Sequence, residues 1–155
     1  MQAYQIQAGQ KIAGLERAQR ASAPLAAHEV RVRMHAVSLN YRDLMIADGT
    51  YLSTGDKPVI PGSDGAGEVI EVGAAVSRFN IGDRVTGSFF PDWIGGAPTP
   101  RNTARALGAV TDGVLAEEVV LHEESWVAIP PHLDYIQAAT LPCAGVTAWN
   151  ALFVE

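Results

Sequence analysis

The most regular pattern of hydrophobic and polar positions lies in residues 30–39, which read VRVRMHAVSL. Every second side chain is hydrophobic, and this alternation predicts a strand with one buried and one exposed face. The two predicted faces carry Val30, Val32, Met34 and Ala36 on one side and Arg31, Arg33 and His35 on the other.

Further short strands are predicted between glycine and aspartate turns. The segments are GEVIEVG (67–73), RFNIGDRVTGSFF (78–90) with a turn at Gly82-Asp83, DGVLAEEVVL (112–121) with a turn at Asp112-Gly113, and SWVAIP (125–130). Many short strands with such turns are typical of a barrel or a folded sheet, not of a doubly wound sheet. We therefore predict a mainly β domain with short helices over residues 1–131.

The pattern changes after Pro131 to an alanine-rich, helical one. Asp134 and Gln137 have the spacing of a capping box, and Pro142 suits the first turn of a second helix. No glycine or proline follows Leu152 to end that helix. We predict a helical connection over residues 132–155, and the missing stop signal indicates that the chain once continued or was truncated.

One short helix is predicted inside the β region, in NYRDLMIADG (40–49). Asn40 suits the N-cap, Asp43 the third helical position and Gly49 the residue after the C-cap. Because this helix follows a strand directly, Asn40 is expected at the end of a sheet, where functional sites often lie.

The glycine-rich stretch IPGSDGAGEVIEVG (60–73) allows more than one interpretation. A dinucleotide-binding loop requires G-x-G-x-x-G between a strand and a helix. Here Gly65-Ala66-Gly67 lacks the third glycine, and a strand follows instead of a helix. Turns and close backbone packing are therefore the favoured roles for these glycines over phosphate binding.

Composition and charge limit the classes of partner and the cellular location that we expect for this protein. The 155 residues carry a net charge of −6 and no cluster of Lys and Arg, so we expect no nucleic-acid partner. No apolar run is long enough to span a bilayer, and the N-terminus lacks a signal-peptide pattern. The single cysteine, Cys143, excludes an internal disulfide and fits a reducing cytoplasm.

Four segments together resemble the medium-chain dehydrogenase/reductase superfamily, and within it the zinc-independent, quinone-oxidoreductase-like branch. They are residues 30–51, 58–85 (PVIPGSDGAGEVIEVGAAVSRFNIGDRV), 112–121 and 138–152 (AATLPCAGVTAWNAL), in the family's order and spacing. The resemblance implies a GroES-like, partly open β-barrel as an N-terminal catalytic domain. In the family, a Rossmann domain that binds NAD(P) follows, and its residues are absent from this sequence.

The resemblance also explains Ser63-Asp64. Zinc alcohol dehydrogenases have a His-Glu pair there, a ligand cysteine where this chain has Ser38-Leu39-Asn40, and a third ligand where Cys143 stands. A catalytic zinc usually takes three protein ligands, so we expect no zinc. Cys143 is then interpreted as a small buried apolar residue, with a reactive thiol as the alternative.

Reduction of a quinone or enone by hydride transfer creates an oxyanion that needs donors and a proton. The resemblance places Asn40 beside the nicotinamide ribose or substrate, although capping alone is an equal alternative. Tyr51 corresponds to a tyrosine near the substrate, and Asp43 is a cap or a catalytic residue. Tyr41 and Thr147 are implied cofactor contacts, with plain packing an alternative for Tyr41.

The predicted function is the substrate side of an NADP(H)-dependent reductase of quinones, enones or related carbonyls, inactive or nearly so by itself. A non-catalytic GroES-like interaction module or truncated remnant is the alternative, and alcohol oxidation is disfavoured because zinc polarises the alkoxide. The last helix is expected to expose an apolar face or pair it with another copy, through Val146, Trp149, Leu152 and Phe153.

The segment 89–107 and the four histidines can each be interpreted without a catalytic role. The segment 89–107, with Phe90 and Trp93, forms either the lip of a substrate pocket or a surface loop with a packed tryptophan. The histidines have no zinc or triad spacing and are interpreted as structural or solvated: His28, His35, His122 and His132.

Overall fold

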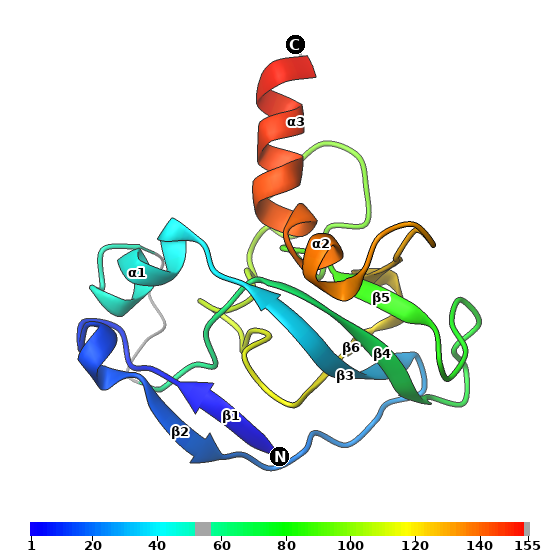
Figure 1. Ribbon diagram of the computed structural model, residues 1–155, viewed down its shortest axis with the longest axis horizontal. Coiled ribbons are helices and arrows are strands. Elements are labelled where there is room, and N and C mark those ends of the chain that lie inside the picture. The colour runs from blue at the N-terminus through cyan, green and yellow to red at the C-terminus, as the bar shows by residue number, and fades with distance from the viewer. Residues whose placement is uncertain (52–56, 154–155) are drawn as a thin grey trace.

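The computed structural model describes residues 1–51 and 57–153 (Figure 1). Its main element is a curled, antiparallel five-stranded sheet in the order β6-β3-β4-β5-β7. The strands are β3 (Glu29–Ser38), β4 (Asp64–Val72), β5 (Arg84–Gly87), β6 (Glu118–His122) and β7 (Trp126–Ala128). The prediction of a mainly β, partly open barrel with short helices is confirmed.

A second, two-stranded sheet pairs β1 (Gln2–Gln5) with β2 (Glu16–Gln19). It is joined to the rest of the fold by the bridge between Ala3 and Ala116. The helical elements are η1 (Ile12–Gly14), α1 (Tyr41–Ala47), η2 (Glu123–Ser125), α2 (Tyr135–Ala139), the short π-helix η3 (Leu141–Gly145) and α3 (Val146–Phe153). None of the helices in the described ranges is long and apolar enough to cross a membrane.

Strand β3 follows its predicted alternation only for half its length. Val30 and Val32 are fully buried in the main core, and Met34 packs against them. Met34 pairs with Gly67 and Ala36 with Ala66, so His35 is one extra residue on β3. Because side chains alternate with a period of two, that bulge reverses the faces. The prediction for Ala36 is therefore wrong: Ala36 packs in a separate cluster with α2, and its neighbour Val37 faces the main core.

The glycine-rich stretch is confirmed as a turn followed by a closely packed strand. Gly62 has φ +85°, a turn conformation, and β4 begins at Asp64, earlier than the predicted start at Gly67. A Cβ atom on Gly67 would lie 2.1 Å from the carbonyl oxygen of Arg33. The glycines thus let β3 and β4 approach closely, as at other close backbone contacts.

The strand predicted directly after Asp112-Gly113 begins later than expected, at Glu118. The intervening backbone bonds to other segments: Val114 N–H donates to Gly62 O at 3.0 Å and Leu115 N–H to Pro61 O at 3.1 Å. Val114 is fully buried in the main core. Long-range pairing therefore replaces the ladder that the local pattern predicted.

Helix α1 begins and ends where the sequence indicates. Asn40 is its N-cap, and Asp43 Oδ2 accepts the Asn40 backbone N–H at 2.8 Å. At the other end Gly49 has φ +72°, its N–H donates to Ile46 O, and the N–H of Thr50 donates to Met45 O. These two hydrogen bonds, together with a glycine in the left-handed conformation, form a Schellman motif.

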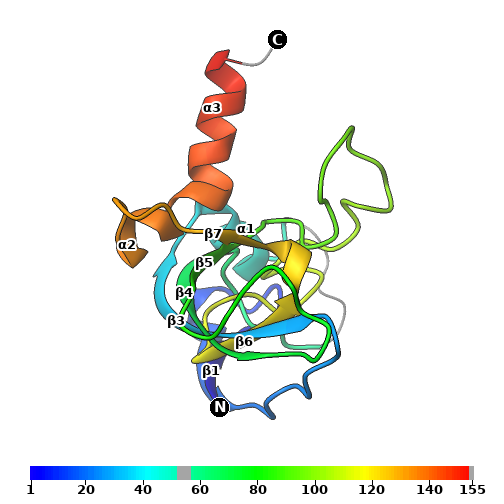
Figure 2. The same cartoon turned by 90° about the vertical axis from the view of Figure 1, so that its right-hand side faces the viewer.

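The C-terminal helices differ sharply in burial. Asp134 and Gln137 form the predicted capping box of α2, and its Ala138 and Ala139 are buried near Ala66. Pro142 lies in the first turn of η3, as expected. Helix α3 projects from the body (Figure 2), and all its described residues are exposed, including Trp149 at 65% and Phe153 at 68%. Its expected apolar exposure is confirmed.

Candidate functional site

The carboxyl group of Asp64 joins three segments at one end of the sheet. Asp64 is fully buried at the first position of β4. Its Oδ2 accepts the side-chain amide of Asn40 at 3.0 Å and the backbone N–H of Cys143 at 3.2 Å. Its Oδ1 accepts the hydroxyl of Ser63 at 3.1 Å. The N-cap of α1, the start of β4 and the middle of η3 are therefore held together by one side chain.

Burial and hydrogen bonding shift the pKa of Asp64 in opposite directions. Burial raises the pKa of the carboxyl above its ordinary value, because the charged form loses its hydration. Hydrogen bonds from Asn40, Ser63 and the backbone N–H groups of Cys143 and Ala144 lower the pKa, but burial has the larger effect. A titratable group with such a shift, next to half-buried polar neighbours, is typical of functional sites.

Asp64 determines how Asn40 presents its amide. A carboxylate can only accept, so the amide must direct its NH₂ group at Asp64. One N–H is used in that bond, the amide side chain also faces the backbone N–H of Asp43 in the capping box, and no residue among 1–51 and 57–153 accepts the second N–H of this half-buried side chain. Asn40 therefore takes part in the capping box of α1 and still has one N–H that could be donated to a ligand.

Asp43 supports Asn40 from the first turn of α1. Its Oδ2 accepts the Asn40 backbone N–H, while its Oδ1 is buried and has no hydrogen-bond partner within residues 1–51 and 57–153. The Oδ1 atom lies 3.7 Å from Nη1 of Arg42. Asp43 thus fixes the backbone at Asn40 and places a negative charge at the helix N-terminus.

Cys143 and Thr147 lie on the same face of the η3–α3 segment. Cys143 is half-buried, not fully buried as expected. Burial raises the pKa of its thiol, as does the charge of Asp64, whereas the charge of Arg42 and a hydrogen bond with Thr147 lower it. The net rise keeps the thiol protonated at neutral pH, which argues against a reactive thiolate. Thr147 contacts the thiol while remaining exposed.

The two tyrosines named from the sequence occupy different positions. Tyr41 is 77% exposed at the start of α1. Tyr51 is 40% exposed, and its ring centroid lies 5.3 Å from the guanidinium carbon of Arg42. Tyr51 is therefore attached to the first turn of α1 through a cation–π contact, whereas Tyr41 is open to solvent.

Arg42 is not among the candidate residues identified from the sequence, because an arginine in the first turn of a short helix is normally solvated. It is only 7% exposed, its Nη1 donates to Leu107 O at 3.0 Å, and its guanidinium carbon lies 4.6 Å from the Phe89 ring centroid. The one signal in the sequence was its place between Tyr41 and Asp43. The role of Asp64 as a shared acceptor was also missed, since it was considered only as a replaced zinc-site residue.

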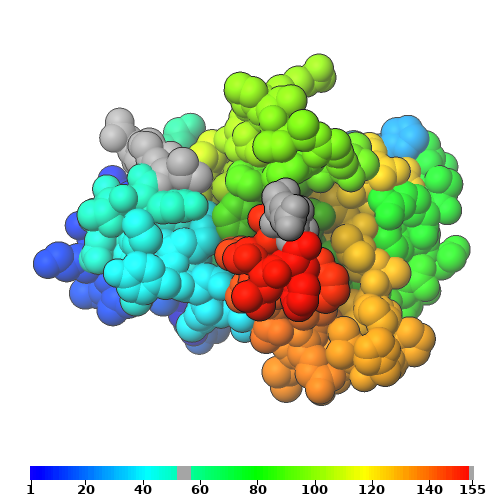
Figure 3. Space-filling model, turned by 90° about the horizontal axis from the view of Figure 1, so that it is seen from above, coloured from blue at the N-terminus to red at the C-terminus, as the bar shows by residue number. Residues whose placement is uncertain are grey.

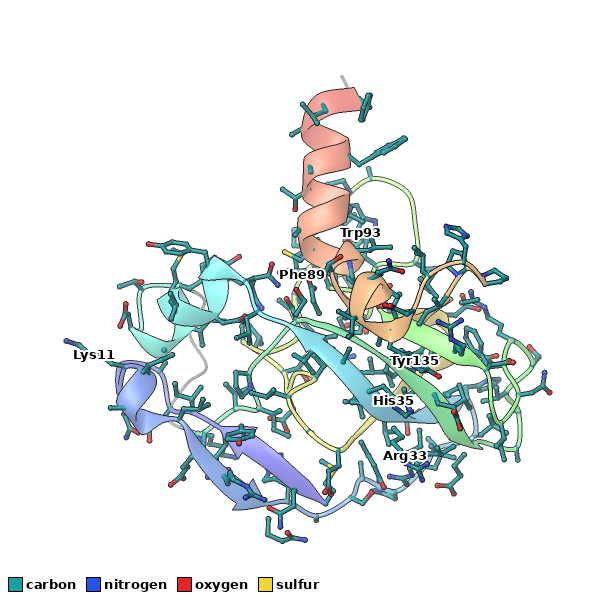
Figure 4. The ribbon with its side chains drawn as sticks, in the orientation of Figure 1. Lys11, Arg33, His35, Phe89, Trp93 and Tyr135 are labelled. Atoms are coloured by element: carbon teal, nitrogen blue, oxygen red, sulfur yellow. The ribbon has the colours of Figure 1, made fainter. Side chains whose placement is uncertain are left out.

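The segment 88–107 begins with an aromatic chain near the foot of α3 (Figure 4). Phe89 contacts Phe90 edge-to-face at 4.6 Å between centroids, and Phe90 contacts Trp93 at 6.1 Å. Trp93 Nε1 donates to Gly96 O, and Leu107 N–H donates to Phe89 O. In the view along α3 (Figure 3), α1 and this segment flank the helix.

The cavity found among the described residues does not coincide with the candidate site. A cavity of about 380 Å³ lies elsewhere, between β1, β3 and residues 115–117, and the predicted site residues are not among the described residues that line it. No group of three or more His, Cys, Asp or Glu side chains in the described part of the chain is arranged to hold a metal ion.

Comparison with known proteins agrees with this architecture. The family "Alcohol dehydrogenase GroES-like domain" matches residues 26–131, more than half of the chain. The chain belongs to this family. It is also, as the resemblance predicted, a member of the medium-chain dehydrogenase/reductase superfamily.

Similar proteins are named as alcohol dehydrogenases or quinone oxidoreductases. A zinc-type alcohol dehydrogenase-like protein of Schizosaccharomyces pombe is 47% identical over 125 residues, which is 81% of this chain and 36% of that protein. A quinone oxidoreductase of Pseudomonas aeruginosa is 39% identical over 119 residues, 77% of this chain and 30% of that protein. The quinone oxidoreductase structure from Coxiella burnetii has a TM-score of 0.79 at 28% identity and covers 98% of this chain and 44% of that one. The chain thus spans less than half the length of these relatives.

Proposed function

We propose that this chain is the substrate-side domain of a zinc-independent, NAD(P)H-dependent oxidoreductase that reduces quinones, enones or related carbonyls. The observation that carries this proposal is the Asn40 amide, held at the sheet end by the buried Asp64 and still able to donate a second N–H. Relatives named quinone oxidoreductase support the substrate class.

The nicotinamide, when bound, supplies the hydride. Asn40 donates its free N–H to the oxygen on which negative charge develops, and Asp64 keeps that amide in place without reorganisation. Tyr51, 40% exposed, is proposed as the donor that gives this oxygen its proton. Asp43 holds the backbone of Asn40, and Tyr41 and Thr147 are proposed to contact the cofactor.

The residues at the position of the zinc-enzyme ligands do not fit a zinc ion. Ser63 donates its hydroxyl to Asp64, and both carboxyl oxygens of Asp64 already accept hydrogen bonds. Donors that converge on Asp64 would have to leave before a cation could bind there. We therefore propose a reaction that does not use zinc, which disfavours alcohol oxidation.

The domain boundaries, the cofactor and the cellular location are proposed from the same family comparison. We propose a catalytic domain over residues 1–131, a helical connection over 132–155, NADPH in preference to NADH, and a cytoplasmic location. We expect the 155 residues to turn over little or no substrate alone, because most of the cofactor surface belongs to a Rossmann domain in this family.

A second candidate function is a non-catalytic interaction module. The observation that favours it is the exposed apolar surface of α3, where Leu152 is 74% exposed and Trp149 65%. Self-association through this helix is the simplest form of that function. Sedimentation of the wild-type chain against Trp149→Glu measures it: a dimer lost in the variant supports the module, and two identical monomers contradict it.

The proposed reductase function is tested by titrating the chain with NADPH while following thermal stability and nicotinamide fluorescence. A shift at micromolar NADPH that is lost in Asn40→Ala and Thr147→Val, but kept in the control His132→Ala, supports it. No shift at millimolar NADPH would mean that this chain is only the scaffold side of a reductase, or a module without catalysis.

A further inference from the structure

Arg42 is a buried cation with an incomplete set of hydrogen bonds. It is 7% exposed, and Nη1 donates to Leu107 O at 3.0 Å. Its Nε and Nη2 atoms are buried and have no hydrogen-bond partner among residues 1–51 and 57–153. Native proteins seldom leave buried polar groups without partners, so this arrangement needs a compensating role.

Aromatic rings contact the Arg42 guanidinium, whose Nε and Nη2 atoms have no hydrogen-bond partner among the described residues. The guanidinium carbon lies 4.6 Å from the centroid of Phe89 and 5.3 Å from that of Tyr51. Such contacts are strongest when the cation is removed from water. Tyr51 follows α1 and Phe89 opens the segment 88–107, so one side chain of α1 orders two separate parts of the chain.

The contact with segment 88–107 is made at its base. Leu107 N–H donates to Phe89 O at 3.1 Å, which brings the two ends of the segment together. Arg42 binds both ends: the ring of Phe89 and the carbonyl oxygen of Leu107. The path of the segment as it leaves the barrel therefore depends on Arg42.

Arg42 is also directly linked to the candidate site. Its Nη1 lies 3.7 Å from Oδ1 of Asp43, and Oδ2 of Asp43 accepts the backbone N–H of Asn40. The Asn40–Asp64 group and the two aromatic rings are thus attached to neighbouring positions of one helical turn. Asn40 and the side chain that contacts both rings, Arg42, are therefore two positions apart at the start of one helix.

We propose that Arg42 is a positioning residue that holds Tyr51 and Phe89 as the aromatic wall of the substrate site. This inference rests on the function proposed above and adds a determinant of binding for flat, ring-shaped carbonyl substrates. Arginine suits the role because its planar group can lie flat against a ring while its in-plane N–H groups donate to a carbonyl, whereas the ammonium group of lysine is not planar and cannot stack in this way.

The first measurement needs no activity. NMR spectra of the whole chain are compared for the wild type, Arg42→Lys, Arg42→Met and the matched control Arg78→Lys, whose guanidinium lies 5.4 Å from the ring of Phe79 outside the site. We expect the ring signals of Tyr51 and Phe89 to move in both Arg42 variants and not in Arg78→Lys. Unchanged Tyr51 and Phe89 signals in Arg42→Lys would overturn the proposal.

A further variant covers the case in which the Arg42 variants fail to fold. Phe89→Leu keeps Arg42 and removes one ring, so the Arg42 Nε–H signal should lose an upfield ring-current shift. An Arg42 signal that is identical in Phe89→Leu and the wild type would overturn the proposal independently.

The second measurement is binding of duroquinone, followed by quenching of tryptophan fluorescence. We expect the dissociation constant to rise roughly tenfold in Arg42→Lys and to stay within about twofold in Arg78→Lys. Weaker binding in Arg42→Lys supports the proposal, whereas equal affinity with altered thermal stability assigns Arg42 a purely structural role and overturns it. If the wild type binds no duroquinone while the Tyr51 signals still follow Arg42, the positioning role stands and the proposed substrate class fails.

Discussion

Asp64 and Glu123 are both buried carboxylates that tie separate segments together, yet their pKa values shift in opposite directions. Glu123 Oε2 accepts the backbone N–H groups of Ser77 and Arg78, each at 2.9 Å, and its Oε1 contacts His28. These bonds lower the pKa of Glu123 to about 2. At Asp64 burial prevails over its donors and raises the pKa.

The opposite pKa shifts indicate different roles for the two carboxyl groups: a structural role for Glu123 and a functional one for Asp64. Glu123 is held in its charged form by donors that converge on it, which suits a purely structural role. Asp64 is placed where the charged form is less favourable, beside the half-buried Asn40 and Cys143. Perturbed pKa values cluster at functional sites, and the raised pKa of Asp64 agrees with the function proposed for this end of the sheet.

Removing the Asp64 carboxyl should have the largest effect. Asp64→Ala leaves the donors of Asn40, Ser63 and Cys143 without their acceptor, and we expect a loss of about 3 kcal/mol in the free energy of unfolding. Urea denaturation measures this loss, with Asp83→Ala as the control, since within the described part of the chain the Asp83 side chain accepts one hydrogen bond, from the turn N–H of Asn80. Equal losses in the two variants would contradict the role assigned to Asp64.

The two carboxylates should also respond oppositely to pH. Because the folded-state pKa of Glu123 is depressed, its stabilisation is complete above the unfolded value of about 4.5 and is lost as the pH falls towards about 2. Asp64, with a raised pKa, instead stabilises at low pH and loses that contribution as the pH rises through its folded pKa.

Denaturation between pH 2 and 7 measures these contributions. Glu123→Gln should flatten the acid limb of the stability profile, while Glu124→Gln, which alters a partly exposed pair with Arg78, should leave it nearly unchanged. Carboxyl-carbon NMR titration gives the two pKa values directly, and a Glu123 midpoint at or above 4.5 would refute the comparison.

Asn40→Ala should have an intermediate effect. The amide donor lowers the pKa of Asp64, so its loss should raise that pKa further and cost about 1 kcal/mol in stability. The carboxyl titration of Asp64 reports the first effect and urea denaturation the second. Asn80→Ala, at an exposed turn, is the control, and an unchanged Asp64 titration in Asn40→Ala would show that the amide does not act on the carboxyl.

Ser63→Ala should have the smallest effect. The buried hydroxyl donates one hydrogen bond to Asp64, and its removal should cost about 0.5–1 kcal/mol while raising the pKa of Asp64. Thermal unfolding detects the change. A loss as large as that of Asp64→Ala would mean that Ser63, and not the carboxyl, organises this end of the sheet.

Much of the local structure could be predicted from the sequence. The capping box of Asp134 with Gln137 and the Schellman motif at Gly49 form between residues that are close in the chain. The glycine pattern correctly predicted a turn and close strand packing. The site was predicted only in part: Asn40 and Asp43 were named with the right local geometry, whereas Arg42 and the shared acceptor Asp64 were not recognised.

The sequence by itself determined the elements whose interactions span a few residues, because caps, turns and alternation act locally. Only the tertiary structure decided which distant groups meet: Asp64 with Cys143, 79 positions apart, and Arg42 with Leu107, 65 positions apart. It also decided that the extra residue at His35 reverses the faces of β3. These outcomes depend on how whole segments pack, and burial, which moves the pKa of Asp64 and encloses Arg42, is a property of the assembled fold alone.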